Sequence, residues 1–226
     1  MIFVIGCGRT GTHWLGRSLE QSGLRVLWED HATFQRSVEL ALYPSRRRRL
    51  LADHIAFYQT QSPMTVCKAH PNLFVARDLA RAVPDAIFLY THRDVRDTVR
   101  SMLHHRGTRR WAIEADLYPE ADDFLGRSNP KLYAELGVAG RCAMRVASHA
   151  LEARSLHRLG IDMLVHDYDA AVVDPEASAS ALSAKLGRAI ELIAPRRRAL
   201  PELTRSQVRE VERALDEVLA DQPGHW

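Results

Sequence analysis

A glycine-rich segment close to the N-terminus has the composition of an anion-binding loop. Residues 6–12 read GCGRTGT, between the apolar run 2–5 and a stretch with helical spacing. A turn from a buried strand into a helix directs backbone N–H groups and the helix N-terminus toward a bound anion. Arg9 adds a positive charge, and Thr10 and Thr12 add hydroxyl donors. The segment therefore predicts a phosphate site; the alternative is a glycine turn that only joins strand to helix.

The loop differs from the P-loop of nucleoside triphosphatases at the two positions that serve Mg-ATP. Gly6 and Gly11 have the P-loop spacing, but Thr12 stands where that motif has lysine, and His13 where it has the magnesium-binding hydroxyl. These differences weaken the interpretation as a P-loop-type nucleotide or small-molecule kinase. They favour a terminal phosphate that is held without a metal.

A second group of charged residues follows the predicted strand 86–90. Residues 93–101 read RDVRDTVRS, so Arg93 leaves the carboxyl end of this strand just before a helix, where ligands bind in open α/β sheets. Arg93 and Ser101 are a little over two helical turns apart and reach one anion only if the turn folds Arg93 back along the helix. By spacing alone, arginines that are solvated or paired with the neighbouring aspartates fit equally well.

Both segments resemble the cofactor motifs of sulfotransferases that use 3′-phosphoadenosine 5′-phosphosulfate (PAPS). Residues 9–15, RTGTHWL, are similar to the family's 5′-phosphosulfate loop, commonly Lys or Arg followed by Ser-Gly-Thr-Thr-Trp. The resemblance implies cofactor contacts from Arg9, Thr10, Gly11, Thr12, His13 and Trp14. Thr10 replaces the usual serine. His13 replaces the second threonine, so an imidazole N–H would have to take the place of a hydroxyl donor.

Two later segments extend this resemblance. Residues 93–101 are similar to the family's 3′-phosphate motif, with Val95 in place of proline, which implies that Arg93 and Ser101 bind the 3′-phosphate. Tyr168 and Asp169 resemble the family's Tyr-Glu-Asp segment and imply a cofactor contact for Tyr168; the alternative is a tyrosine at the end of a core strand. The family's Arg-Lys-Gly segment has no match after residue 187. Candidates to replace it are Arg196, Arg197 and Arg198, or Arg106, Arg109 and Arg110, although solvated basic faces explain both groups.

The resemblance implies in-line transfer of a sulfuryl group from PAPS to a hydroxyl or amine, with charge growing on the bridging oxygen. Arg9 and Lys68 are the candidate cations for that oxygen. The segment from Lys68 to His70 and the following proline resembles the Lys-Thr-His-Leu-Pro segment of cytosolic sulfotransferases, so His70 is the first candidate base. Glu29 is the alternative, because other branches use a glutamate after the second strand. With 11 histidines in the chain, a packed or surface role competes for any one of them.

The elements that must position these residues alternate between strand and helix. Strands are predicted at 2–5, 25–28, 65–68, 86–90 and 163–166, and helices at 12–22, 47–59 and 138–159. This alternation is typical of an α/β fold with a central parallel sheet flanked by helices, and the resemblance implies the P-loop-NTPase-like sulfotransferase form of it. Two further helices have start signals, Asp174-Pro175 and the capping-box pair Thr204 and Gln207.

Two stretches carry predictions about burial. The helix 138–159 is predicted to be amphipathic, with Arg141 and Arg145 on its polar side. Residues 107–136 are the least regular part and are interpreted as a lid or acceptor-binding insertion. Aromatic side chains in this stretch could line an acceptor pocket or belong to the core: Trp111, Tyr118, Phe124 and Tyr133.

Composition limits the class of protein. A chain of 226 residues with 46% apolar residues is predicted to form a single domain over 1–226. A net charge of +3 does not indicate a nucleic-acid partner, and three scattered cysteines do not indicate a disulfide framework. No apolar run reaches membrane-spanning length. We therefore expect a cytoplasmic enzyme without a metal, acting on a small-molecule acceptor; oligomeric state stays open.

Two alternatives concern the chemistry of the site. A zinc site built from His104, His105 and His149 has no supporting ligand spacing. A non-catalytic nucleotide-binding module would keep Arg9 and Arg93 but would need neither His70 nor Glu29.

Overall fold

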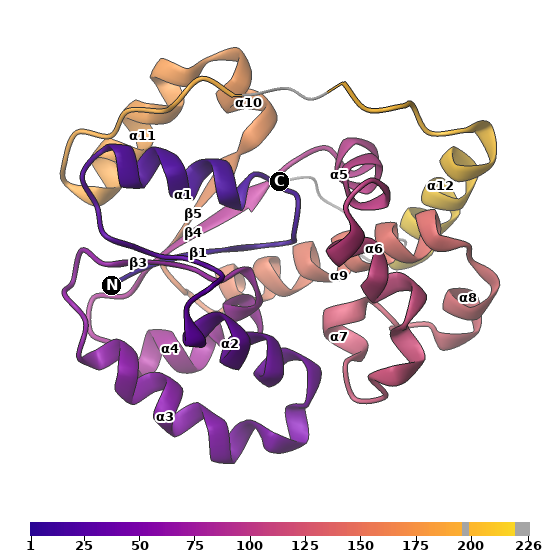
Figure 1. Ribbon diagram of the computed structural model, residues 1–226, viewed down its shortest axis with the longest axis horizontal. Helices are drawn as coiled ribbons and strands as arrows, with labels where there is room; N and C mark the ends of the chain where they lie inside the picture. Colours follow the sequence, from indigo (N-terminus) through magenta and orange to yellow (C-terminus); the bar gives the residue numbers. More distant parts are fainter. Residues whose placement is uncertain (196–198, 220–226) are drawn as a thin grey trace.

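The computed structural model describes residues 1–195 and 199–219 and contains a parallel sheet of five strands (Figure 1). The strands lie in the order β2-β3-β1-β4-β5, and each neighbouring pair is parallel. Their bounds are β1 Ile2–Gly6, β2 Val26–Leu27, β3 Val66–Lys68, β4 Ile87–His92 and β5 Met163–Asp167. This arrangement confirms the predicted α/β fold with a central parallel sheet.

Strand β1 lies in the middle of the sheet because both of its faces are apolar. All five of its residues are buried, and successive side chains point to opposite faces. Ile2 and Val4 pack into the cluster on one face, whereas Phe3 and Ile5 pack into the cluster on the other. The ring of Phe3 stacks on that of Phe88 in β4 at 5.2 Å between centroids. The strand therefore fixes the position of the glycine loop that follows it.

Helices cover both faces of the sheet (Figure 1). On one face lie α1 Thr12–Gln21, α10 Tyr168–Val173 and α11 Pro175–Leu186. On the other lie α2 Ala32–Leu42, α3 Arg47–Gln59, α4 Ala76–Ala82 and the second half of α9 Val138–Arg158. Short 3₁₀ turns, η1 Pro44–Arg46 and η2 His70–Val75, connect elements on this second face.

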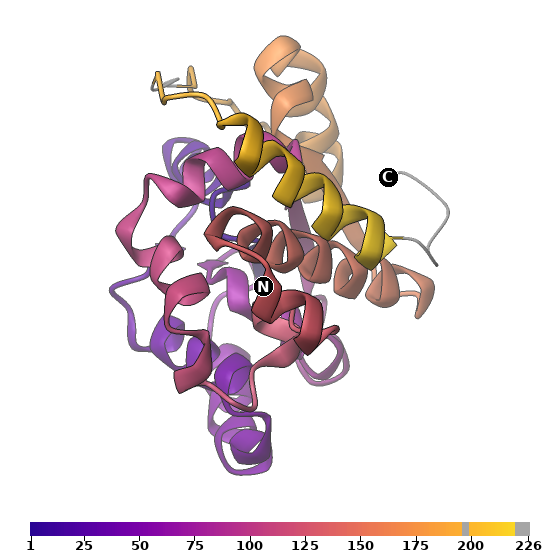
Figure 2. The ribbon, with the colours of Figure 1, turned by 90° about the vertical axis from the view of Figure 1, so that its right-hand side faces the viewer.

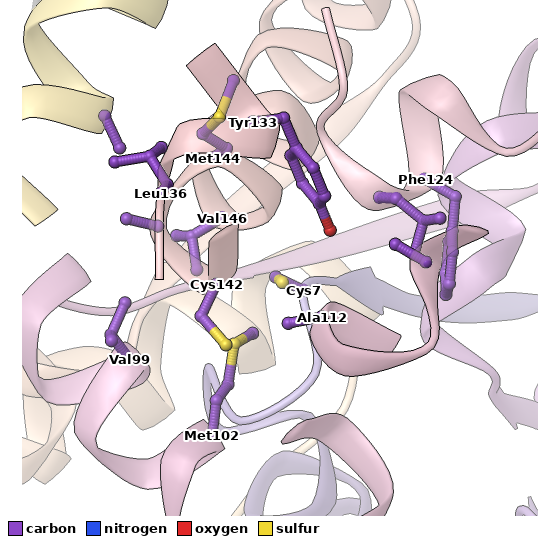
Figure 3. Close-up of a cluster of buried hydrophobic side chains, with 14 of the residues drawn as sticks. Cys7, Val99, Met102, Ala112, Phe124, Tyr133, Leu136, Cys142, Met144 and Val146 are labelled. Carbon is purple, nitrogen blue, oxygen red and sulfur yellow. The ribbon is translucent and has the colours of Figure 1, made fainter. Parts of the chain in front are cut away.

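A third hydrophobic cluster extends the molecule beyond the sheet. It is built from α5 Val95–Leu103, α6 Arg106–Ile113, η3 Ala115–Leu117, α7 Asp122–Leu125, α8 Pro130–Glu135, the first half of α9 and α12 Arg205–Leu219. Figure 2 shows α12 in front of α9, and Figure 3 shows Cys7 of the glycine loop within this cluster. The cluster thus joins the added helices to the loop.

The stretch 107–136 has more regular structure than its sequence predicts. It consists of short helices with capped ends. At the start of α8, Asn129 accepts a hydrogen bond from the backbone N–H of Leu132. Gly126 ends α7 in the left-handed conformation. A Cβ atom on Gly126 would lie 2.4 Å from the carbonyl of Met144, so α7 approaches α9 closely. These helices bury Phe124, Leu132 and Tyr133.

Arg145, which the sequence puts on the polar side of its helix, is buried. Arg145 is only 3% exposed. The sequence pattern fails here because α12 and the short helices cover the side of α9 that the pattern assigns to solvent.

The predicted starts of the last two long helices are confirmed. Asp174 accepts a hydrogen bond from the N–H of Ala177, with Pro175 at the first helical position. The N–H of Thr204 donates to the Gln207 side chain at 2.9 Å, and the N–H of Gln207 donates to Thr204 Oγ1 at 3.3 Å. No helix among the described residues is both long and apolar enough to span a membrane.

Candidate active site

A cavity of about 1260 Å³ opens at the carboxyl ends of β1, β3 and β4. It collects side chains from the glycine loop, the loop after β2, η2, α5, α6 and α10. All the site residues predicted from the sequence line it except Thr10: Arg9, Gly11, Thr12, His13, Trp14, Glu29, Lys68, His70, Arg93, Ser101 and Tyr168. Segments that are far apart in the sequence therefore meet at one edge of the sheet.

The glycine loop has a backbone that requires glycine at two positions. Gly6 and Gly11 have φ angles of 145° and 102°. A Cβ atom on Gly6 would lie 2.7 Å from Thr91 Oγ1, and one on Gly11 would lie 2.6 Å from Cδ2 of Tyr168. Helix α1 begins directly after Gly11, so its first N–H groups, which have no partner within the helix, face the cavity. The loop can therefore bind an anion through its backbone.

Thr10 is a buried residue whose hydroxyl bonds within the protein. Its hydroxyl donates to the Cys7 carbonyl at 2.6 Å and lies 2.8 Å from Thr91 Oγ1 in β4. The residue is 2% exposed. The side chain therefore holds the loop against β4, which differs from the expected contact between its hydroxyl and a ligand.

The two anion motifs predicted from the sequence touch one another. Arg9 Nε donates to Ser101 Oγ at 3.0 Å, across the gap between the glycine loop and α5. Arg9 has a φ of 79°, a conformation that is uncommon for a residue with a side chain. Partial burial, with a contribution from the nearby Arg93 charge, lowers the pKa of Arg9. Two arginines held this close indicate a site for a multiply charged anion.

Arg93 reaches the first turn of α5 and the start of α10. Its guanidinium lies 3.5 Å from Asp97 and 3.7 Å from Asp169, and 5.0 Å from the centre of the Tyr168 ring. The carboxylates of Asp97 and Asp169 hold the arginine in place, so the aspartate pairing considered in the sequence analysis is also present. Tyr168 in turn packs against Gly11 and connects the two motifs.

His13 and Trp14 differ in what they contact. The His13 ring lies 4.9 Å from that of Trp28, and its burial, with the charges of Lys68 and Arg17, lowers its pKa. Trp14 lies between the rings of His166 and Tyr168, and its indole N–H donates to the Ile193 carbonyl at 2.9 Å. Trp14 therefore helps to position the ring of Tyr168 and anchors the segment after α11.

That segment is a part of the site that was not predicted from the sequence. Ile193, Ala194 and Leu200 line the cavity, and the N–H of Ile193 donates to Ser18 Oγ in α1. The sequence feature that could have indicated this segment is a short apolar stretch next to basic residues. The candidates Arg196, Arg197 and Arg198 lie outside the described residues. Of the other arginine group, Arg110 lines the cavity and pairs with Glu114.

Lys68 is a buried cation with one carboxylate partner. It is 2% exposed, and its ammonium donates to the carboxylate of Glu29, whose side chain is 46% exposed at the cavity. Burial lowers the pKa of Lys68, and the charge of Glu29 opposes this effect. The stem of Lys68 lies under Gly16 of α1, where a Cβ atom would be 3.2 Å from it. The lysine is thus held beside the glycine loop.

His70 presents an uncharged imidazole to the cavity. It is 8% exposed, and its ring lies 5.7 Å from that of Phe34. A Cβ atom on Gly8 would lie 3.7 Å from His70 Nε2, so this nitrogen is beside the glycine loop. Burial, followed by the charge of Lys68, holds the pKa of His70 well below its usual range. The imidazole is therefore uncharged at neutral pH.

A buried polar network under His70 was not predicted from the sequence. His54 Nε2 is 2.9 Å from Asn72 Oδ1, and Asn72 Nδ2 donates to the hydroxyl of Tyr58 at 3.0 Å. Tyr58 lies 3.0 Å from the sulfur of Cys67 in β3. The network fixes η2, which begins at His70, against α3 and β3. The sequence signal was present: His54 and Tyr58 are one turn apart on the buried side of α3.

Part of the cavity lining is an aromatic region. Trp111, Tyr118 and Phe124 line it, with 5.2 Å between the rings of Trp111 and Tyr118. Tyr133, the fourth aromatic considered in the sequence analysis, belongs to the core instead. This part of the cavity suits an apolar or aromatic ligand.

The histidines considered for zinc do not form a site. The two ring nitrogens of His149 each lie 3.0 Å from a backbone carbonyl, those of Gly6 and Phe124, and the residue is fully buried. His104 and His105 are exposed. Within residues 1–195 and 199–219, no three His, Cys, Asp or Glu side chains are grouped to hold a metal ion.

Comparisons with known proteins identify the family. The chain is similar to a sulfotransferase from Alicyclobacillus acidocaldarius, with a TM-score of 0.55 and 14% identity over 100% of this chain and 96% of that one. This similarity concerns the fold. No curated protein sequence matches the chain. The sequence pattern of the sulfotransferase domain matches residues 1–130, more than half of the chain. The protein therefore belongs to the sulfotransferase family.

Proposed function

We propose that this protein transfers a sulfuryl group from PAPS to a hydroxyl or amine of a small-molecule acceptor. The observation that carries the proposal is the contact between Arg9 and Ser101. This contact joins the glycine loop to α5 at one edge of the sheet, which supports two neighbouring anion sites. A nucleotide with a 5′-phosphosulfate and a separate 3′-phosphate has the two anions that such a pair of sites would bind.

The 5′-phosphosulfate would be held by the backbone N–H groups at the start of α1, with Thr12, His13 and Arg9 around it. The 3′-phosphate would be held by Arg93 and Ser101. Ser101 Oγ accepts a hydrogen bond from Arg9, so its own proton is available for a phosphate oxygen. Tyr168 and Trp14 would contact the nucleotide from the α10 side.

In the reaction, the acceptor oxygen or nitrogen attacks sulfur while the bond from sulfur to the bridging phosphate oxygen breaks. The negative charge on the departing 3′-phosphoadenosine 5′-phosphate (PAP) grows at that oxygen. Lys68 and Arg9 are the cations that would stabilise it, because both reach the cavity beside the glycine loop. The phosphosulfate would compete with Glu29 for the ammonium of Lys68.

The acceptor proton would go to His70, whose imidazole is already neutral in the free protein. Glu29 is the alternative base: its carboxylate is accessible from the cavity, but its pairing with Lys68 occupies it in the free protein. We further propose that residues 1–226 form one domain and that the helices within 107–136 bind the acceptor. The aromatic lining of Trp111, Tyr118 and Phe124 supports this role.

The proposal is tested by measuring PAP formation from PAPS with a panel of phenol and amine acceptors, without metal. We expect acceptor-dependent PAP formation that Lys68→Met reduces by about a hundredfold or more. His70→Gln and Glu29→Gln, compared at equal protein concentration, separate the two candidate bases: the variant of the true base loses activity while the other keeps it. Transfer of phosphate from Mg-ATP without any use of PAPS would contradict the proposal.

A further inference from the structure

Arg145 in α9 is a buried cation without a counter-charge. The residue is 3% exposed, and its Nε, Nη1 and Nη2 atoms are each buried without a hydrogen-bond partner in the described part of the chain. Arg141, one turn earlier on the same helix, shows the contrast: its Nε donates to the carbonyls of Tyr133 and Leu136 at 3.0 Å. Placing Arg145 here without a partner disfavours the folded state, because an unpaired charge in a protein interior is unfavourable.

The groups nearest to Arg145 do not neutralise it. Its guanidinium carbon lies 4.3 Å from the centre of the Phe124 ring and 5.9 Å from that of Trp111. Two thiols are also close, but burial raises the pKa of Cys7 to about 11 and of Cys142 to about 12, so both are uncharged at neutral pH. The ring faces stabilise a cation only weakly compared with a carboxylate.

The position of Arg145 relates it to the candidate active site. Phe124 and Trp111, the rings that cover its guanidinium, both line the cavity at the aromatic region. Arg145 is also close enough to His70 for its charge to act on that imidazole. Figure 3 shows Phe124 and Cys7 in the same hydrophobic cluster. The unpaired cation thus lies behind two rings that line the cavity, and its charge acts on the candidate base.

We propose that Arg145 selects acceptors that carry a carboxylate on an aromatic body. This inference rests on the proposed function. The aromatic body would pack in the region of Trp111, Tyr118 and Phe124. The carboxylate would pair with the guanidinium fork once the half-buried Trp111 ring, the outer of the two rings that cover it, turns aside while Phe124 stays in place. The acceptor hydroxyl would then face His70 and the glycine loop. The acceptor class is therefore an aromatic hydroxy acid.

The test compares two phenols that differ in charge, para-hydroxyphenylacetate and the neutral para-ethylphenol, binding to the protein saturated with PAP. We expect the wild type to bind the carboxylate compound at least about tenfold more tightly, since a charge-assisted pair of this kind contributes over 1 kcal/mol. Arg145→Met should remove this preference, whereas the control Arg141→Met should keep it. Arg145→Met should also unfold at a temperature no lower than the wild type, because it replaces an unpaired charge by an apolar chain.

Three other results would contradict either the inference about Arg145 or the proposed function. Equal or weak binding of both phenols by the wild type overturns the inference, and this arm needs no variant to fold. A carboxylate preference that survives in Arg145→Met also overturns the inference, whether or not the variant is less stable. It assigns Arg145 a structural role. Absence of PAP binding by the wild type would instead contradict the proposed function, so the two failures are distinguishable.

Discussion

At the scale of single residues, the environment of His70 determines how activity should depend on pH. Burial and the charge of Lys68 hold its pKa well below its usual value of 6.5. If His70 is the base, kcat/KM should stay constant from about pH 7.5 to about pH 6.5 and fall only in more acidic solution, where the imidazole gains a proton. The measurement is kcat/KM against pH. A decline centred above 6.5 would contradict this assignment.

Gly11 offers a second prediction at this scale. Gly11→Ala should weaken PAP binding by at least about tenfold, because its Cβ atom would lie 2.6 Å from the Tyr168 ring and displace the loop or the ring. Gly160→Ala is the matched control: Gly160 also has a positive φ, 76°, but nothing lies within 4 Å of its Cβ position.

Calorimetric titration measures the loss of PAP affinity, and thermal unfolding measures the loss of stability from backbone strain. Gly160→Ala should lose about 1 kcal/mol of stability from backbone strain alone and keep its PAP affinity. Equal affinities of Gly11→Ala and the wild type would show that the contact between Gly11 and Tyr168 does not shape the cofactor site.

Residue types and spacing were sufficient to predict many of the side chains that share the cavity, but not their contacts. The positions of Arg9, Arg93 and Ser101 follow from motifs at strand ends, where parallel strands bring loops together. The inward direction of Thr10 and the burial of Arg145 were not predictable. Both depend on neighbours distant in sequence: Thr91 for the first, and Trp111 and Phe124 for the second.

At the scale of elements, the start of α12 gives a stability prediction. Thr204→Ala removes the side-chain acceptor for the N–H of Gln207 and should lower the free energy of unfolding by about 1 kcal/mol. Ser206→Ala, at an exposed position one residue into the helix, is the control and should change stability by less than about 0.5 kcal/mol. Urea unfolding measures both. Equal midpoints for the two variants would contradict a stabilising capping box.

Strands and most long helices were predictable because local patterns determine them. The five short apolar runs became the five strands, and helix 47–59 has the predicted bounds. The helices within 107–136 were missed because each is short and its apolar residues become buried only against α9. The burial of α9 on several sides likewise depends on α12, which is far away in the sequence.

At the scale of the whole molecule, buried neutral histidines should make stability depend on pH. Burial lowers the pKa of His54 to about 4 and of His166 to about 4. In the unfolded chain both titrate near 6.5, so below that pH the unfolded state binds more protons and the folded state loses stability until the folded pKa is reached. At about pH 5 the loss should be on the order of 2 kcal/mol for each.

Urea unfolding at about pH 7.5 and about pH 5 measures this loss, and His54→Gln should remove part of it. His157→Gln, at an exposed position, should leave the dependence unchanged. Stability that is equal at both pH values would contradict the neutral state of these imidazoles.

The central parallel sheet and its α/β class were predictable from the sequence because one alternation of strands and helices dominates the chain. The route of residues 188–195 past α1 was not, since it rests on contacts such as that of Trp14 with Ile193. This route matters for function because Ile193 and Ala194 line the cavity beside the proposed nucleotide site.

Calorimetric titration with PAP, without magnesium, tests the use of PAPS most directly. We predict micromolar binding by the wild type and a loss of about tenfold to a hundredfold in Arg93→Ala, because a hydrogen-bonded charge pair with a phosphate is removed. Arg96→Ala is the matched control on the same helix, since Arg96 is exposed and pairs with Glu212 of α12, and it should bind PAP like the wild type. No binding of PAP, or binding only of ATP with magnesium, would contradict the account.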